Sequence, residues 1–163
     1  MTDIDSTTNA DLEAFMHRFY TEFWNTGNVA AADDMIAEDL IHEFPPGWPT
    51  GREGFKKLVL TWRDAFPDLH EHVEFVMADG NRVLSRFRLT GTHQGNFYGI
   101  APTGRSIDIH GVDVARLEDG KIVEYFYHED TFGLFRQLGA FPEDYGSVAG
   151  TAVTSDEQSV TPR

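Results

Sequence analysis

The chain has 163 residues, of which 40% are hydrophobic and 13% aromatic, and its formal net charge is −14 at pH 7. This size and composition predict one folded domain with a hydrophobic core and exclude an intrinsically disordered chain. The excess of acidic residues argues against binding to nucleic acids or anionic membranes, whose phosphates an acidic surface repels. The acidity itself fits either simple solubility or life in a saline cytoplasm.

The sequence has no run of about 18 apolar residues that would predict a membrane span. Its first five residues lack the basic and apolar parts of a signal peptide. It also contains no cysteine, which excludes a disulfide framework and thiolate chemistry. We therefore expect a cytoplasmic protein that does not act at a membrane.

Helical periodicity dominates the first third of the chain. Apolar residues between positions 12 and 24 recur at i, i+3 and i+4, which predicts an amphipathic helix. Thr8 and Asp11 are expected to cap its start. A short second helix is expected over residues 29–37, followed by an extended piece over residues 40–44 and a proline-rich loop.

A third helix is predicted to begin at Thr50, because Thr50 and Glu53 have the spacing of a capping box. Pro67 should end it, since proline cannot continue a helix and restricts the residue before it. The residues that this helix would turn toward the core are Phe55, Leu58, Val59, Trp62 and Phe66.

After Asp68 the apolar pattern alternates, which predicts strands. We expect a first hairpin that turns at residues 79–80 and a second that turns at residues 118–121. Asp130 is a natural cap for a last helix that runs to Gly139. Helices followed by an antiparallel meander give an α+β fold, in which helices pack on one face of a curled sheet and leave an apolar cavity.

The domain is expected to span residues 9–144. Residues 1–8 are expected to form a flexible N-terminus. Residues 145–163 are rich in glycine, serine, threonine and acidic residues, which predicts a disordered tail.

Asp113 stands in the middle of an otherwise apolar strand, on the face that also carries Ile109, Gly111 and Ala115. An ionised group in a core is unfavourable unless it is paired or used in chemistry. One interpretation is that Asp113 lines the cavity as a functional acid. The other is that it forms an ion pair with one of the nearby arginines Arg86, Arg88 and Arg116.

The order and spacing of several short motifs resemble those of the SnoaL-like polyketide cyclases, a branch of the NTF2-like superfamily, over about residues 10–142. These motifs are Trp24-Asn25-Thr26-Gly27, Gly91-Thr92-His93-Gln94-Gly95, Asp119-Gly120-Lys121-Ile122 and Arg136-Gln137-Leu138-Gly139. The resemblance implies an NTF2-like cone-shaped barrel with helices on a curved antiparallel sheet, commonly a homodimer. It also implies ring closure by an intramolecular aldol step without metal or cofactor.

The resemblance extends only in part to the residues that carry out the family's reaction. The family's acid/base aspartate falls on Tyr127, and the histidine that assists it falls on Asp113. Two positions that shape the family's pocket fall on Trp24 and Leu58. The pair known for ring closure is therefore not preserved in this chain.

The residues that remain still suit acid/base chemistry. Strand alternation places Tyr127 on a face that would look into the same cavity as Asp113. Burial would raise the pKa of Asp113 toward that of a useful base, and the Tyr127 hydroxyl could donate to a developing enolate. Each also has a structural interpretation, since Tyr127 would serve equally as a buried phenol with a satisfied hydroxyl. His42 lies where the extended piece meets the proline-rich loop, at the expected rim of the pocket.

The favoured hypothesis is an enzyme that performs enolisation, isomerisation or aldol cyclisation on a small hydrophobic carbonyl compound. Asp113 would be the base, Tyr127 the donor and His42 an auxiliary, with no metal and no cofactor. The expected substrate-binding residues are Trp24, Leu58, Phe97 and Tyr20. The alternatives are a non-catalytic small-molecule-binding protein of the same fold and a hydrolase with an Asp-Arg-Asp arrangement around a water.

Overall fold

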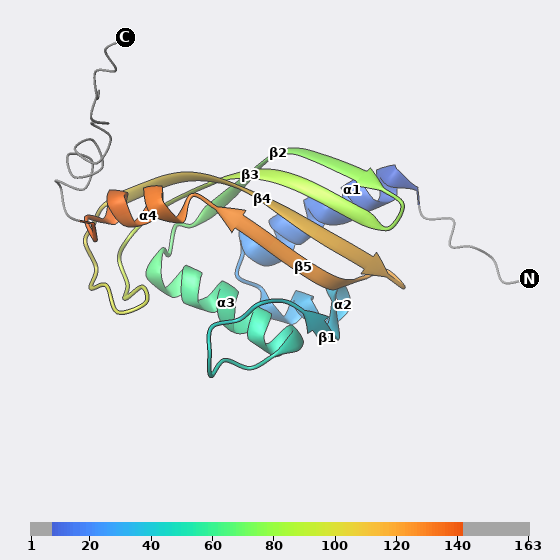
Figure 1. The fold of residues 1–163 in the computed structure, drawn as a ribbon, viewed down its shortest axis with the longest axis horizontal. Helices are drawn as coiled ribbons and strands as arrows, with labels where there is room; N and C mark the ends of the chain where they lie inside the picture. The colour runs from blue at the N-terminus through green and yellow to red at the C-terminus, as the bar shows by residue number, and fades with distance from the viewer. Residues whose placement is uncertain (1–7, 142–163) are drawn as a thin grey trace, which may run out of the picture.

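The computed structural model describes residues 8–141, and Figure 1 shows the arrangement of its helices and strands. The predicted tail over residues 145–163, and all but Thr8 of the predicted flexible N-terminus, lie outside the described residues. The elements, in chain order, are α1 (Asn9–Arg18), η1 (Phe19–Trp24), η2 (Val29–Ala31), α2 (Ala32–Met35), β1 (Ile36–Ile41), α3 (Gly51–Ala65), β2 (His70–Asp79), β3 (Arg82–Thr92), β4 (Ser106–Glu118), β5 (Lys121–Glu129) and α4 (Thr131–Leu138).

The five strands form one curved sheet in the order β1-β5-β4-β3-β2, and α1 and α3 lie on the same side of it (Figure 1). Strands β2 to β5 form the predicted antiparallel meander. The edge strand β1 adds one parallel pair to this predicted antiparallel arrangement, because it pairs with β5 in parallel. A parallel pair needs a long connection, and α3 with strands β2 to β4 separates β1 from β5 along the chain.

Residues 29–41 depart most from the predicted elements. The expected helix over residues 29–37 is a 3₁₀ turn followed by the short helix α2, and the strand begins at Ile36 rather than at Leu40. Ile36 pairs with Ile122 of β5 and is buried. Pairing with a distant strand therefore overrides the local helical pattern.

The first helix is continuous through η1, where it widens into a π-helix whose last turn is closed by a hydrogen bond from Asn25 N–H to the Tyr20 carbonyl. Its start carries the predicted capping box between Thr8 and Asp11. The expected box at Thr50 does not form: Thr50 is the N-cap residue of α3, but its side chain makes no capping hydrogen bond. Glu53 instead pairs with Lys56 one turn later.

The last helix, α4, follows the prediction at both ends. The Asp130 carboxylate accepts a hydrogen bond from the Gly133 N–H at 2.8 Å, and Gly139 ends the helix in the left-handed conformation. None of the helices within residues 8–141 is both long and apolar enough to span a membrane.

The face of the sheet toward the helices is the core, and alternation along each strand decides which residues reach it. The buried residues of β3 and β4 on this inner face are Val83, Ser85, Phe87, Leu89, Gly91, Ile107, Ile109, Gly111, Asp113, Ala115 and Leu117. The opposite, outer face carries the arginines of both strands. The sheet thus separates the ion pairs of the surface from a core that contains acids.

Candidate active site

Asp113 lies at the centre of the inner face and is only 1% exposed. Its Oδ2 accepts a hydrogen bond from the hydroxyl of Tyr20 on the first helix and another, at 2.8 Å, from Tyr125 on β5. Its Oδ1 is buried and has no hydrogen-bond partner. Ser85 stands directly across the β3–β4 pair, and its hydroxyl also acts to lower the pKa of Asp113.

No arginine partners Asp113 within residues 8–141, so the ion-pair interpretation is wrong. Strand alternation turns the nearby arginines to the outer face, where each pairs with an acid there. These pairs are Arg86 with Glu74, Arg88 with Asp108, and Arg116 with Glu118 and Glu124. Burial raises the pKa of Asp113 to about 6, while the hydrogen bonds from Tyr20 and Tyr125 act in the opposite direction.

Two further carboxyl groups, Glu71 and Glu129, face the same interior. Glu71 on β2 is 5% exposed, and its pKa is raised well above the ordinary value, first by burial and then by Asp113 and Glu129. Asn25 fixes its backbone through one hydrogen bond to the Glu71 carbonyl and one from the Glu71 N–H. Glu129, at the end of β5, is half-buried, and burial raises its pKa to about 7. Neither forms an ion pair in the part of the chain that the structure describes.

A small cavity lies between these acids and the helices, with room for about one water molecule. Two of its buried polar atoms, Trp24 Nε1 and Glu71 Oε2, have no hydrogen-bond partner. The cavity is otherwise largely apolar. Its lining residues are Trp24, Trp62, Glu71, Phe87, Leu89, Tyr125, Tyr127 and Glu129.

A larger groove with a volume of about 400 Å³ lies beside the cavity, along the C-terminal half of β5. Strand β1 pairs with β5 only as far as Glu124, so the backbone edge beyond that residue is left to the segment after β1. The groove is lined by His42, Glu43, Phe126, Tyr127, His128, Glu129 and Thr131. Tyr127 and Glu129 line both spaces and therefore stand between the groove and the cavity.

His42 sits at the side of this groove, as expected for a rim residue. Its Nδ1 lies 2.5 Å from the carbonyl oxygen of Tyr125, and because a carbonyl only accepts, Nδ1 must carry the proton. Burial lowers the pKa of His42, although the hydrogen bond to Tyr125 opposes this. The neutral ring then has a lone pair on Nε2. The ring stacks on Tyr127 with centroids 5.7 Å apart.

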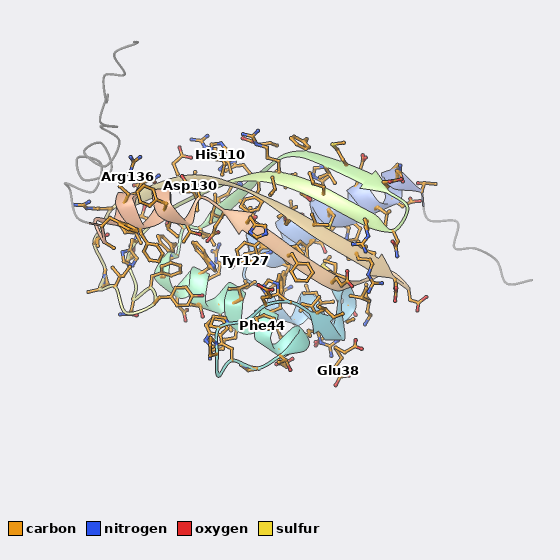
Figure 2. All side chains as sticks on the ribbon, in the orientation of Figure 1. Glu38, Phe44, His110, Tyr127, Asp130 and Arg136 are labelled. Carbon is orange, nitrogen blue, oxygen red and sulfur yellow. The ribbon has the colours of Figure 1, made fainter. Side chains whose placement is uncertain are left out.

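Tyr127 points from β5 to the helix side of the sheet, whereas His110 projects from the opposite side (Figure 2). The pKa of Tyr127 is raised, mainly by burial and then by Glu129, so its hydroxyl remains protonated at neutral pH. The phenol is thus a neutral hydrogen-bond donor at the boundary of the two spaces.

The structure distributes the sequence-predicted residues over three places. Asp113 accepts a hydrogen bond from Tyr20 behind the cavity wall. Tyr127 and Trp24 line the cavity, and His42 lines the groove. Leu58 and Phe97 are buried in the core and line neither space. Phe97 packs on Trp62 with ring centroids 4.6 Å apart, so it supports the cavity wall.

Sequence reasoning missed Glu71 and Glu129 as interior acids. Glu71 stands next to His70 and His72, which suggested a solvated strand, although Glu71 and Val73 pair with Leu89 and Phe87 of the inner face. Glu129 follows the same alternation as Tyr125 and Tyr127, and that signal could have found it.

Comparison with known proteins agrees with this architecture. The family model for SnoaL-like polyketide cyclase matches residues 14–138. The chain is 32% identical over 131 residues to aklanonic acid methyl ester cyclase DauD of Streptomyces sp. (strain C5), covering 75% of this chain and 78% of that protein. It is 32% identical over 127 residues to nogalonic acid methyl ester cyclase of Streptomyces nogalater, covering 76% and 95%.

Among solved structures, TsrD from Streptomyces laurentii superimposes with a TM-score of 0.75 at 25% identity, covering 85% of this chain and all of that one. The matched segment includes every strand of the sheet and the helices that enclose the cavity. On these grounds the chain belongs to the SnoaL-like polyketide cyclase family and has its NTF2-like α+β fold.

Proposed function

We propose that this protein is a cofactor-independent enzyme that moves protons at a carbon next to a carbonyl group of a hydrophobic compound. The reaction class is enolisation, with isomerisation or aldol ring closure as its outcome. The observation that carries the proposal is the group of three acids on the inner face, beside tyrosine hydroxyls and an apolar cavity, with no cation among residues 8–141 to neutralise them.

Acids in such surroundings suit this chemistry because a general base works best when its pKa lies near the working pH. Asp113, with a pKa near 6, is largely ionised at neutral pH yet is a stronger base than an exposed aspartate. In the proposal Asp113 takes the α-proton, using the Oδ1 atom that has no partner in the structure. Tyr20 and Tyr125 hold the other oxygen and fix the carboxylate in place.

Tyr127 donates a hydrogen bond to the enolate oxygen that forms as the proton leaves. Its position between groove and cavity supports this role, since a carbonyl group that enters from the groove meets it first. His42 assists by stacking on the phenol, and the lone pair on its Nε2 can accept a proton in the groove.

The substrate class follows from charge and space together. A carboxylate would be repelled by Glu71, Asp113 and Glu129, so a neutral ketone or ester fits better. Two relatives are named as cyclases of polyketide methyl esters, which agrees with a neutral substrate. The groove can take a ligand of several rings, whereas entry into the cavity requires Tyr127 and Glu129 to move.

One observation favours a second candidate, a binding protein without catalysis. The family's aspartate is replaced by Tyr127, and Asp113 does not line the cavity in this conformation. Such a protein would hold an apolar carbonyl compound in the groove. It would leave the α-protons of its ligand unchanged.

We also propose that the protein is a homodimer formed through the outer face of the sheet. Met77, Leu84, Val114 and Phe126 stand in register as an exposed apolar row across four strands. Charges of both signs flank this row, including the Arg86–Glu74 and Arg116–Glu124 pairs. A second copy related by a two-fold axis would meet apolar surface with apolar surface and charge with opposite charge.

Deuterium exchange at a ketone separates the two functions. The protein is incubated in D₂O with 1-tetralone, a neutral aryl ketone, and loss of the α-proton signal is followed by NMR. We expect exchange that is faster than in buffer and saturates with ketone concentration. Saturable binding without faster exchange would support the binding protein and reject the enzyme.

A further inference from the structure

Glu129 is the carboxyl group of this site that lies within reach of both the enclosed cavity and the groove. Its side chain makes no hydrogen bond or ion pair with residues 8–141, although its backbone carbonyl accepts a hydrogen bond from Thr131. Across the sheet its partner position is Gly111, which has no side chain to cover it. The carboxyl group is therefore partly shielded from water, and it is open to a ligand on the groove side.

We propose that Glu129 is a second catalytic residue, a general acid that gives its proton to the carbonyl oxygen attacked during ring closure. The inference rests on the proposed function and assigns a residue to the second proton transfer of its aldol outcome. An aldol step needs two proton transfers, one from carbon and one to oxygen. The proposed function assigns the first transfer to Asp113, and Glu129, at the junction of the two spaces, is placed for the second.

The atoms balance over the cycle. Asp113 takes the α-proton, the enolate carbon forms a bond to the second carbonyl carbon, and the π-electron pair of that carbonyl moves to its oxygen. Glu129 donates its proton to this oxygen, and the product is an isomer of the substrate. Once the product has left, Asp113 releases a proton to water and Glu129 takes one up from the groove.

The charged and titratable groups around Glu129 are consistent with a proton donor at neutral pH. Burial raises its pKa to about 7, so about half of the molecules carry the acid form at pH 7. Glu71 on β2, Tyr127 on β5 and Tyr98 on the 97–100 turn also face it. His42, Glu43 and His128 line its groove side. None of these is a fixed cation that would hold the group ionised.

Ketone binding tests this role without requiring turnover. The probe is 6-propionyl-2-(dimethylamino)naphthalene, a neutral fluorescent ketone whose carbonyl oxygen accepts hydrogen bonds but cannot donate one. We expect its Kd for the wild-type protein to rise about tenfold between pH 6 and pH 8, because deprotonated Glu129 no longer donates. Glu129→Gln should bind with a Kd that changes far less, since an amide donates at either pH. Glu38→Gln, an exposed acid on β1 far from Tyr127 in Figure 2, should behave as wild type.

A pH dependence that survives in Glu129→Gln would overturn the inference, as would a wild-type protein that binds the ketone equally at both pH values or not at all. Reaction of 1-(2-acetylphenyl)propan-2-one, an aromatic diketone that can close a ring, separates this inference from the proposed function. Glu129→Gln should lose at least about 100-fold in ring closure while α-deuterium exchange continues. Equal ring closure in both proteins would reject Glu129 alone, whereas absence of exchange in wild type would reject the proposed function.

Discussion

Asp113 and Tyr127 stand directly opposite each other on β4 and β5, yet Asp113 takes its hydrogen bonds from Tyr20 and Tyr125. The hydroxyl of Tyr127 is therefore not committed to the carboxylate beside it. Two tyrosines position the acid, and the third faces the space where a ligand would lie. This division of roles gives the site its proposed base and its proposed donor as separate groups.

Removal of the Tyr125 hydroxyl should raise the pKa of Asp113 above its value of about 6. The hydrogen bond from Tyr125 favours the ionised carboxylate and lowers its pKa. In Tyr125→Phe this effect is lost, and burial raises the pKa of Asp113 further. We also expect a loss of about 1–3 kcal/mol in the free energy of unfolding. The measurement is a pH titration of the aspartate carboxyl carbons by ¹³C NMR. Tyr127→Phe serves as the control, and an equal shift of Asp113 in both variants would contradict the assignment.

Stability should fall as the pH rises from about 4 to about 7. Asp113 and Glu129 have raised pKa values in the folded protein, so the unfolded chain ionises first and binds fewer protons over this range. A carboxyl group whose pKa is raised in the folded protein stabilises the fold fully at pH values below its pKa in the unfolded chain. This stabilisation is lost as the pH rises through its pKa in the folded protein. For Asp113 the loss amounts to about 2–3 kcal/mol.

Urea unfolding at a series of pH values measures this fall. Asp113→Asn should remove part of it, because the amide does not ionise. Asp108→Asn, at an exposed position where pairing with Arg88 lowers the aspartate pKa, should leave the slope above pH 5 unchanged. A free energy of unfolding that rises between pH 5 and pH 7 would show that the interior acids are not buried as described.

Gly111→Ala should destabilise the protein by about 1–3 kcal/mol. An added Cβ would clash with the ring of Phe87 and would lie 2.8 Å from the His128 carbonyl oxygen. Because that oxygen belongs to the backbone, relieving the contact would distort the sheet. The same methyl group would narrow the space beside Glu129, so ketone binding should weaken as well. Chemical denaturation and probe fluorescence on one preparation check both effects, and unchanged stability would show that the sheet yields more readily than expected.

Val114→Glu should convert the proposed homodimer into a monomer. Val114 lies in the middle of the apolar row, where a carboxylate would lose water on dimerisation without gaining a partner. Light scattering after size-exclusion chromatography gives the mass. Leu60→Glu, which changes an equally exposed residue on α3, should leave the mass unchanged. A monomeric wild-type protein would refute the proposed interface.

Local sequence signals predicted much of the fold because they report local physics. The capping residues Thr8 and Asp130 and the alternation around Asp113 all reappear in the structure. The start of β1 at Ile36 could not be predicted in this way, because it depends on parallel pairing with β5, far away in the sequence.

The candidate site was predictable only in its separate parts. Alternation placed Asp113 and Tyr127 on the inner face, but not the two hydroxyls that bind Asp113. One of these comes from Tyr20, 93 positions away, on a helix whose packing the pattern does not determine. Glu71 escaped notice because its neighbours His70 and His72 look solvent-exposed, although it shares the alternation of Val73.

The most direct test of the central claim is α-deuterium exchange of bound 1-tetralone by wild type and by Asp113→Asn, with ketone affinity measured on the same samples. We expect the variant to bind the ketone with similar affinity and to lose at least about 100-fold in exchange rate, since an amide cannot take the proton. Exchange at the wild-type rate in Asp113→Asn would contradict the assignment of the base.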